Sequence, residues 1–345
     1  MPVRTLALLG LAVTLGLTGC DRNKGGEAPS AGSEAAPLTV YSARNEQLIQ
    51  PLLNAYSQQT GIPVQLVTAQ AGQLLERLDN ERQHSPADLL LTVDAGNLWQ
   101  AAQLGLLQPL DSKKLIAAIP AHLRDPQNRW FGLSVRARTI VHHPERAPAQ
   151  SLSSYAALAE PQWKGRLCLR TSEKVYNQSL VAMLIAQHGA EKTQEIVTGW
   201  VANLAAPPFS NDTAVMEAID AGQCDVGIVN TYYYGRLTRD EPDAEVALFW
   251  ADQQGEGVHV NVSGGGVTVS SDQPEQAQAL LEWLASPEAQ GRFAGGNLEY
   301  PANPSVPAEK VVRSWGDFRP NLINVAEAGR RQAEAVKLMD RAGYR

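Results

Sequence analysis

Short apolar runs alternate with amphipathic segments along the first third of the chain. The run 38–42 is apolar, and the segment 47–59 then repeats apolar residues at helical spacing. The alternation continues with expected strands at 61–67 and 88–92 and expected helices at 71–83 and 98–104. Strands and helices in this order predict a parallel sheet covered by helices on both faces.

A second region of strands and helices begins after a long apolar run at 132–141. This run predicts a long strand in which Arg136 and Arg138 occupy alternate positions. The strands and helices expected after it lie at 166–170, 176–187, 190–202, 212–221 and 225–229. The chain therefore contains two successive α/β regions.

The last third begins with a β-rich segment, 258–270, with Gly264-Gly-Gly266 at its centre. These glycines lack the spacing and the following helix of a dinucleotide site, so we expect them to permit a crossover or a close contact between lobes. Helical patterns at 274–285, 287–293 and 326–342 complete the chain. The folded part, about 38–345, is larger than one core usually becomes, which leaves two lobes or one large α/β domain.

Composition and motifs argue against two classes of function. The formal net charge is −7, whereas a nucleic-acid-binding protein would need a basic face. No GxSxG, HExxH or phosphate-loop motif is present, so we do not expect an enzyme. None of the six histidines has the spacing of metal ligands.

The N-terminus has the features of an export signal. A basic start at Arg4 precedes the apolar run 6–17, which is too short to cross a membrane. The run closes with Leu17-Thr-Gly-Cys20, which resembles the lipobox of bacterial lipoproteins. That resemblance implies removal of a signal peptide, 1–19, and lipidation of Cys20. The alternative is an ordinary cleaved signal in which Cys20 lies near the cut.

The segment 20–37 has almost no residues to bury and is rich in Gly, Ala, Ser, Pro and Glu. This composition predicts a flexible tether between the lipid and the folded part. Asp21, directly after Cys20, resembles the signal that retains lipoproteins in the inner membrane of Gram-negative cells. We therefore expect a periplasmic protein anchored to the inner membrane surface.

Two further cysteines, Cys168 and Cys224, each lie in or beside a strand-like run. Cysteines in an oxidising compartment commonly pair, so we expect a disulfide between them. The alternative is two small buried apolar residues. No CxxC spacing or histidine partner favours a redox or zinc site.

Several fragments in a shared order resemble the iron(III)-binding periplasmic proteins of ABC transporters, also called bacterial transferrins. The resemblance covers essentially the whole chain after the tether. The fragments are Val40-Tyr-Ser-Ala-Arg44, Thr60-Gly-Ile-Pro-Val64, Pro86-Ala-Asp-Leu-Leu90, Thr92-Val-Asp-Ala-Gly96, Trp163-Lys-Gly165, Val175-Tyr-Asn-Gln178, Asn230-Thr-Tyr-Tyr-Tyr234 and Tyr300-Pro301.

The resemblance implies an α/β, two-lobe periplasmic-binding-protein fold of type II, with the ligand cleft between the lobes. The lobes it implies are 38–136 plus about 262–300, and 137–261 plus about 301–345. It also implies a monomer that captures ferric iron and delivers it to an ABC permease and its ATPase.

Ferric iron (Fe³⁺) is a hard cation that favours anionic oxygen ligands such as phenolate. In the resemblance, Tyr232 and Tyr233 occupy the positions of the family's paired iron-binding tyrosines. Tyr176 matches an additional tyrosine of one subclass. The alternative is that these residues are ordinary core or helix-start aromatics.

The chain departs from the family pattern in the first lobe. Several relatives carry a histidine where this chain has Asn45 and a glutamate where it has Val93. The neighbouring Glu46 and Asp94 could reach the metal, but a carboxylate in such a place is more often a helix cap or a solvated charge. We therefore expect a site of three phenolates plus an exogenous anion.

Family members complete the iron shell with an anion such as carbonate or phosphate, which a guanidinium can hold through paired donors. Arg136 matches the family's anion-contacting arginine, and Arg44 and Ser172 could assist. The alternative for Arg136 is a salt bridge between the lobes. The departures in the first lobe also leave open a binding protein of the same fold for an organic or oxyanion ligand.

Overall fold

The computed structural model describes residues 36–345. The expected signal peptide, Cys20 and nearly all of the tether lie outside the described residues. Within 36–345, no helix combines the length and the apolar character that crossing a membrane requires.

All strands of the described part belong to one connected sheet. Its order is β2-β1-β3-β8-β4-β6-β5, and β7 and β9 both pair with β4. In chain order the strands are β1 (Leu38–Ser42), β2 (Val64–Thr68), β3 (Leu89–Thr92), β4 (Phe131–His142), β5 (Leu167–Cys168), β6 (Val226–Asn230), β7 (Ala247–Phe249), β8 (Val260–Val267) and β9 (Tyr300–Pro301).

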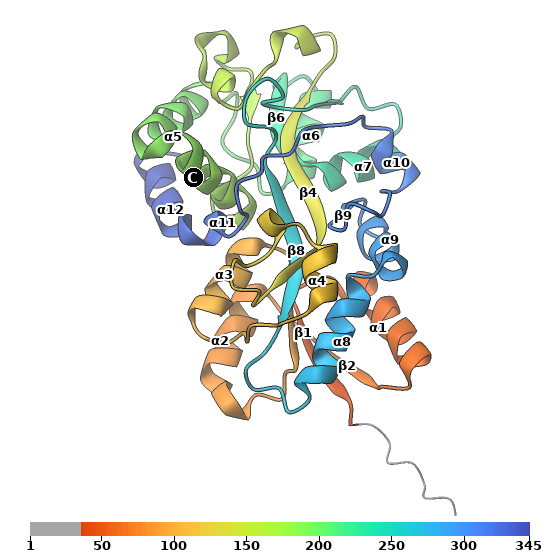
Figure 1. The fold of residues 1–345 in the computed structure, drawn as a ribbon. Helices are drawn as coiled ribbons and strands as arrows, with labels where there is room; N and C mark the ends of the chain where they lie inside the picture. Colours follow the sequence, from red (N-terminus) through yellow and green to blue (C-terminus); the bar gives the residue numbers. More distant parts are fainter. Residues whose placement is uncertain (1–35) are drawn as a thin grey trace, which may run out of the picture. The chain divides into compact units, whose positions relative to one another are not determined.

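The helices connect these strands in the alternation expected from the sequence (Figure 1). They are α1 (Glu46–Thr60), α2 (Ala71–Glu81), α3 (Ala95–Gln103), α4 (Lys113–Ala118), α5 (Val175–Ala202), α6 (Asp212–Asp220), α7 (Thr231–Asp240), α8 (Pro274–Leu284), α9 (Pro287–Gly295), α10 (Lys310–Arg313), α11 (Glu327–Arg330) and α12 (Gln332–Arg341).

Two long antiparallel strands, β4 and β8, join the first half of the sheet to the second (Figure 1). Strand β4 pairs with β8 from Phe131 to Ala137 and with β6 from Arg138 to His142. On the other side, β8 pairs with β3, which is parallel to β1. The two long strands therefore run through both halves of the sheet and bring their residues side by side where the halves meet.

The three glycines of β8 allow this strand to fit between β3 and β4. A Cβ at Gly264 would meet the carbonyl oxygen of Phe131, and one at Gly265 would meet the side chain of Leu91. These contacts agree with the crossover that was expected of this glycine run, and they lie within the expected first lobe rather than between lobes.

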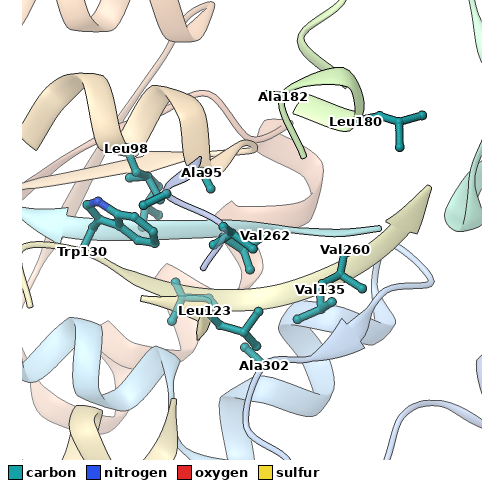
Figure 2. Packing of buried hydrophobic residues seen from close by; sticks show 14 of the residues in the cluster. Ala95, Leu98, Leu123, Trp130, Val135, Leu180, Ala182, Val260, Val262 and Ala302 are labelled. Atoms are coloured by element: carbon teal, nitrogen blue, oxygen red, sulfur yellow. The ribbon is translucent and has the colours of Figure 1, made fainter. Parts of the chain in front are cut away.

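Apolar side chains cover both faces of the crossing strands. Figure 2 shows Ala95 and Leu98 on one side of the strands and Leu123 and Ala302 on the other. Trp130 is fully buried in the same cluster. Burial of the apolar surface of these side chains stabilises the position of β4 and β8.

The C-terminal segment contacts both halves of the described part. Helix α12 packs on α5, while α11 contacts both α3 and α5. The expected helix 326–342 is divided at Arg331, and the two helices expected around residue 189 form one element interrupted at Gly189, which has φ 79°. Cys168 and Cys224 are joined by a disulfide, with the sulfurs 2.06 Å apart.

Candidate functional site

A cavity of about 230 Å³ lies beside the crossing strands, and both halves of the chain line it. Its lining is unusually rich in tyrosine and arginine. The lining residues are Ala43, Arg44, Asn45, Leu48, Val93, Arg136, Tyr176, Tyr232, Tyr233, Arg236, Ser263, Asn297 and Glu299.

The structure brings the three expected tyrosines together in this cavity. Tyr232 and Tyr233 lie in the first turn of α7, directly after the buried strand β6, and Tyr176 lies in the first turn of α5. The rings of Tyr232 and Tyr233 have centroids 4.5 Å apart. Helix N-termini favour negative charge, and all three tyrosines lie in the first turn of a helix.

Burial disfavours the phenolate forms of Tyr176 and Tyr232 in the absence of a cation. It raises the pKa of Tyr232 well above its usual value, and the neighbouring Tyr176 and Tyr233 raise this pKa further, while Arg136 opposes them. Burial also raises the pKa of Tyr176, against the influence of Arg136 and of hydrogen bonding with Tyr232. A cation that binds these oxygens must displace their protons.

The two terminal nitrogens of the Arg136 guanidinium have different surroundings. Its Nη2 lies 3.3 Å from Oδ2 of Asp94, in a buried salt bridge. Within residues 36–345, its buried Nη1 has no hydrogen-bond partner. The guanidinium carbon lies 5.6 Å from the centre of the Tyr176 ring. This salt bridge joins two residues of the expected first lobe, so it is not the salt bridge between lobes that was the alternative for Arg136. A donor remains for an anion in the cavity.

Asp94 is fully buried and does not line the cavity, contrary to the hypothesis that it reaches a metal. Its carboxylate caps α3 by accepting from the Gly96 amide at 2.7 Å, and it also accepts from Ser179 and Asn261. Burial raises the pKa of this carboxyl, and Arg136 opposes the rise. The capping role, which the sequence left open, accounts for this residue.

Asn45 lines the cavity, but Glu46 does not. The Asn45 side chain caps α1 by accepting from the Gln47 amide at 3.0 Å. Glu46 is exposed in the first turn of the same helix, where its charge faces solvent. Val93 also lines the cavity, so this side of the cavity offers little anionic character.

Glu299 is the carboxylate in the cavity lining, and Arg44 neutralises it. The two residues form a buried salt bridge of 3.1 Å, and Ser134 also donates to Glu299 at 2.7 Å. Ser172 lies in a separate depression near α12, so the structure does not bring it to the cavity. Of the three expected anion contacts, Arg136 and Arg44 therefore line the cavity.

Sequence reasoning missed Arg236. Its guanidinium carbon lies 5.2 Å from the Tyr232 ring centre and 5.5 Å from that of Tyr233. Its Nη2 donates a hydrogen bond to the side-chain oxygen of Asn297. Recognition of α7 as a helix would have indicated this residue, because positions three and four residues apart share a helix face.

The described residues 36–345 hold no group of three His, Cys, Asp or Glu side chains that could bind a metal. Among the side chains that line the cavity, the phenolic oxygens of the three tyrosines suit a hard cation. The guanidinium of Arg236 and the free Nη1 of Arg136 would attract an anion that accompanies a cation, whereas Arg44 is neutralised by Glu299.

Residues 38–295 match the family of bacterial extracellular solute-binding proteins. Iron uptake protein A1 of Synechocystis is 39% identical over 335 residues, which cover 95% of this chain and 93% of that protein. Iron uptake protein A2 of Synechocystis is 42% identical over 322 residues, which cover 91% and 92% of the two chains.

Solved structures agree with these sequence relatives. A Trichodesmium FutA protein in complex with iron and citrate ligands superposes with a TM-score of 0.87 at 42% identity, over 90% of this chain and 100% of that one. Ferric iron-binding protein A of Mannheimia haemolytica, in an open conformation, gives a TM-score of 0.84 at 36% identity, over 90% and 99% of the chains.

Proposed function

Because this chain belongs to the bacterial extracellular solute-binding proteins, we propose that it is the substrate-binding subunit of an ABC importer for ferric iron. The fold is the two-lobe α/β type of the ferric-binding proteins. The observation that carries the proposal is the cluster of Tyr176, Tyr232 and Tyr233 in one cavity. Phenolates are suited to a hard trivalent cation.

We place the lobes at 38–136 plus about 262–300 and at 137–261 plus about 301–345. The pairing of β4 supports the first boundary, because this strand leaves β8 for β6 between Ala137 and Arg138. The cavity lies beside this change of partner. Closure of the lobes around the ligand would add contacts that the open form lacks and so favour the loaded state.

An anion completes the iron shell in this proposal. Carbonate, phosphate or a carboxylate of a chelator such as citrate would accept from the free Nη1 of Arg136. Arg236, at the tyrosine rings, supplies a second positive charge. Asn45 offers a neutral oxygen on the opposite side of the cavity, while Arg44 already holds Glu299.

Delivery requires partners outside this chain. The iron-loaded form would dock on a membrane permease, and a partner ATPase would supply the energy for transport. Relatives include periplasmic ferric-binding proteins, which fits capture in the periplasm. In the proposal the protein is a monomer held at the inner membrane by lipid on Cys20, which mass spectrometry of the mature N-terminus would detect.

The arginine-rich lining supports one second candidate. Arg44, Arg136 and Arg236 would also suit an organic acid or an oxyanion bound without iron. The three clustered phenols favour iron, because their oxygens become hard anionic ligands once a cation displaces their protons.

Equilibrium dialysis separates the two candidates. Dialysis against ferric citrate, with iron and labelled citrate both counted, should give one iron per protein. Labelled citrate without iron should not be retained. In the variant Tyr232→Phe with Tyr233→Phe, iron retention should be lost, because two of the three phenolates are removed. Retention of citrate without iron by the unaltered protein would favour the organic-anion candidate.

A further inference from the structure

The side chain of Asn230 connects Tyr232 to a buried ion pair behind the cavity. Its Nδ2 donates to the Tyr232 oxygen at 3.2 Å, and its Oδ1 accepts from Nη1 of Arg138 at 3.2 Å. The same Nη1 donates to Asp212 at 2.9 Å. All three side chains behind Tyr232 are buried. The result is a chain of hydrogen bonds from a carboxylate to a phenolic oxygen.

The chemistry of the side chains fixes which atom donates in each of these hydrogen bonds. A guanidinium can only donate, so the amide oxygen of Asn230 must face Arg138. The amide nitrogen must then face Tyr232, whose oxygen accepts. Asn230 stands at the position before α7, where asparagine often caps a helix, yet its side chain makes no such cap. The amide is instead committed to Arg138 and Tyr232.

Arg138 also fixes the helix that carries Tyr176. Its Nε and Nη2 donate to Oδ1 of Asn177 at 3.0 and 2.7 Å, and Asn177 directly follows Tyr176 in α5. Asp212 in turn accepts from the backbone amide of Asn230 at 3.0 Å. One buried guanidinium therefore holds the starts of both helices that present the tyrosines.

We propose that Asn230 is a positioning residue for metal binding, which holds the Tyr232 oxygen toward the cavity and donates a hydrogen bond to it in the iron-loaded state. The inference rests on the proposed function. A phenolate bound to iron keeps lone pairs that can accept such a bond. The donated hydrogen bond withdraws electron density from the oxygen, which raises the energy of phenolate-to-iron charge transfer.

A purely structural asparagine would act differently. Its loss would lower the melting temperature without moving the visible band of the iron complex. Asn203 offers a matched control, because it is also buried and donates to the carbonyl oxygens of Leu158 and Glu160 rather than to a tyrosine. The position of the charge-transfer band therefore distinguishes the two roles.

The test uses the purified protein with Asn230→Leu, Asn230→Asp and Asn203→Leu variants, loaded with ferric citrate. Leu removes both hydrogen bonds of the Asn230 side chain. Asp keeps the shape of the side chain but places an oxygen where the Nδ2 donor to Tyr232 was. In both Asn230 variants the band should move to longer wavelength, and iron affinity in competition with citrate should fall about ten- to a hundredfold, as for loss of a hydrogen bond to a charged group. Asn203→Leu should lower thermal stability and leave the band in place.

Two outcomes would overturn the inference, and they are distinguishable. An unmoved band in folded Asn230 variants, with a normal band in the unaltered protein, contradicts the role of Asn230 alone. Absence of any iron-dependent band in the unaltered protein contradicts the proposed function and the inference with it. Circular dichroism on each variant establishes that it is folded, and Asn230→Asp serves where Leu is not accommodated.

Discussion

Each phenolate that binds iron must first lose its proton, so affinity depends on pH through the tyrosines themselves. Burial raises the pKa of both Tyr176 and Tyr232, so these groups are neutral over the physiological range. With three phenolate ligands, the logarithm of affinity should rise by about three for each pH unit. Tyr176→Phe should reduce this slope to about two, measured by iron competition between pH 5 and 7.

A slope unchanged by Tyr176→Phe would show that Tyr176 does not bind the metal. Competition with the same chelator in both proteins cancels the pH dependence of the chelator. Tyr234 offers a control, because it lies in the same helix as Tyr232 but does not line the cavity. Tyr234→Phe should leave the slope at its original value.

Asp225 couples stability to pH away from the cavity. Burial alone would raise the pKa of this carboxyl, but hydrogen bonds from Arg166 and Arg146 lower it below its usual value. The folded state therefore gains stability above the unfolded pKa of about 3.9, and this gain is lost as the pH falls through the folded pKa.

Asp225→Asn should lower the free energy of unfolding by about 1–2 kcal/mol at pH 7. The value is small because Arg146 and Arg166 are each about one-third exposed, so solvent screens the interaction. Denaturant unfolding at pH 7 and at pH 3 measures the effect. The difference between the two proteins should shrink in acid, and an equal difference at both pH values would contradict the assignment.

The resemblance to the iron(III)-binding proteins pointed to the three tyrosines and Arg136, and the structure brings all four into the lining of one cavity. The sequence could not decide between the two uses of Asp94, since a helix cap and a metal ligand both follow a strand. Ser172 lies outside the cavity because of the path that the chain takes before α5, and no local sequence pattern predicts this path. Arg236 and Asn230 act through contacts that appear only once α7 is formed.

At the scale of elements, β8 depends on glycine where it lies between β3 and β4. A Cβ at Gly264 would meet the backbone oxygen of Phe131, which cannot move aside without distorting β4. Gly264→Ala should therefore lower the free energy of unfolding by about 1–3 kcal/mol. A Cβ added at Gly72 in α2 would have nothing within 4 Å, so Gly72→Ala should be neutral or stabilising.

Thermal unfolding of the two alanine variants checks this contrast. If the Gly264→Ala protein were as stable as the unaltered one, β8 and β4 would be able to move apart without a loss of folding free energy. The same substitution should also lower iron affinity if the crossing strands fix the geometry of the cavity. The two readouts together relate the packing of β8 to the site.

Hydrophobic spacing predicted the long elements well. Helix α1 and strand β4 lie within a few residues of their expected positions. The short strands β7 and β9 contain three and two residues, too few to produce a pattern. Helix α7 was missed because its polar and aromatic residues hide the helical period, and α5 joins two expected helices across Gly189.

At the scale of the whole described part, the proposed function requires a change of lobe arrangement. Both halves line the cavity, so a ligand held by the tyrosines on one side gains contacts when the other side approaches. Small-angle scattering should show a smaller radius of gyration with ferric citrate than without it. The Tyr232→Phe, Tyr233→Phe variant should show no change, and an equal contraction in this variant would indicate that closure does not depend on the phenolates.

The central claim is that tyrosine phenolates bind ferric iron, and an ultraviolet-visible titration tests it most directly. The iron-stripped protein without residues 1–20 is titrated with ferric citrate in carbonate buffer, beside the Tyr232→Phe, Tyr233→Phe variant. We predict a visible charge-transfer band that saturates at one equivalent of iron and is absent from the variant. A protein that binds no metal and develops no band would contradict the account and leave an organic or oxyanion ligand as the cargo.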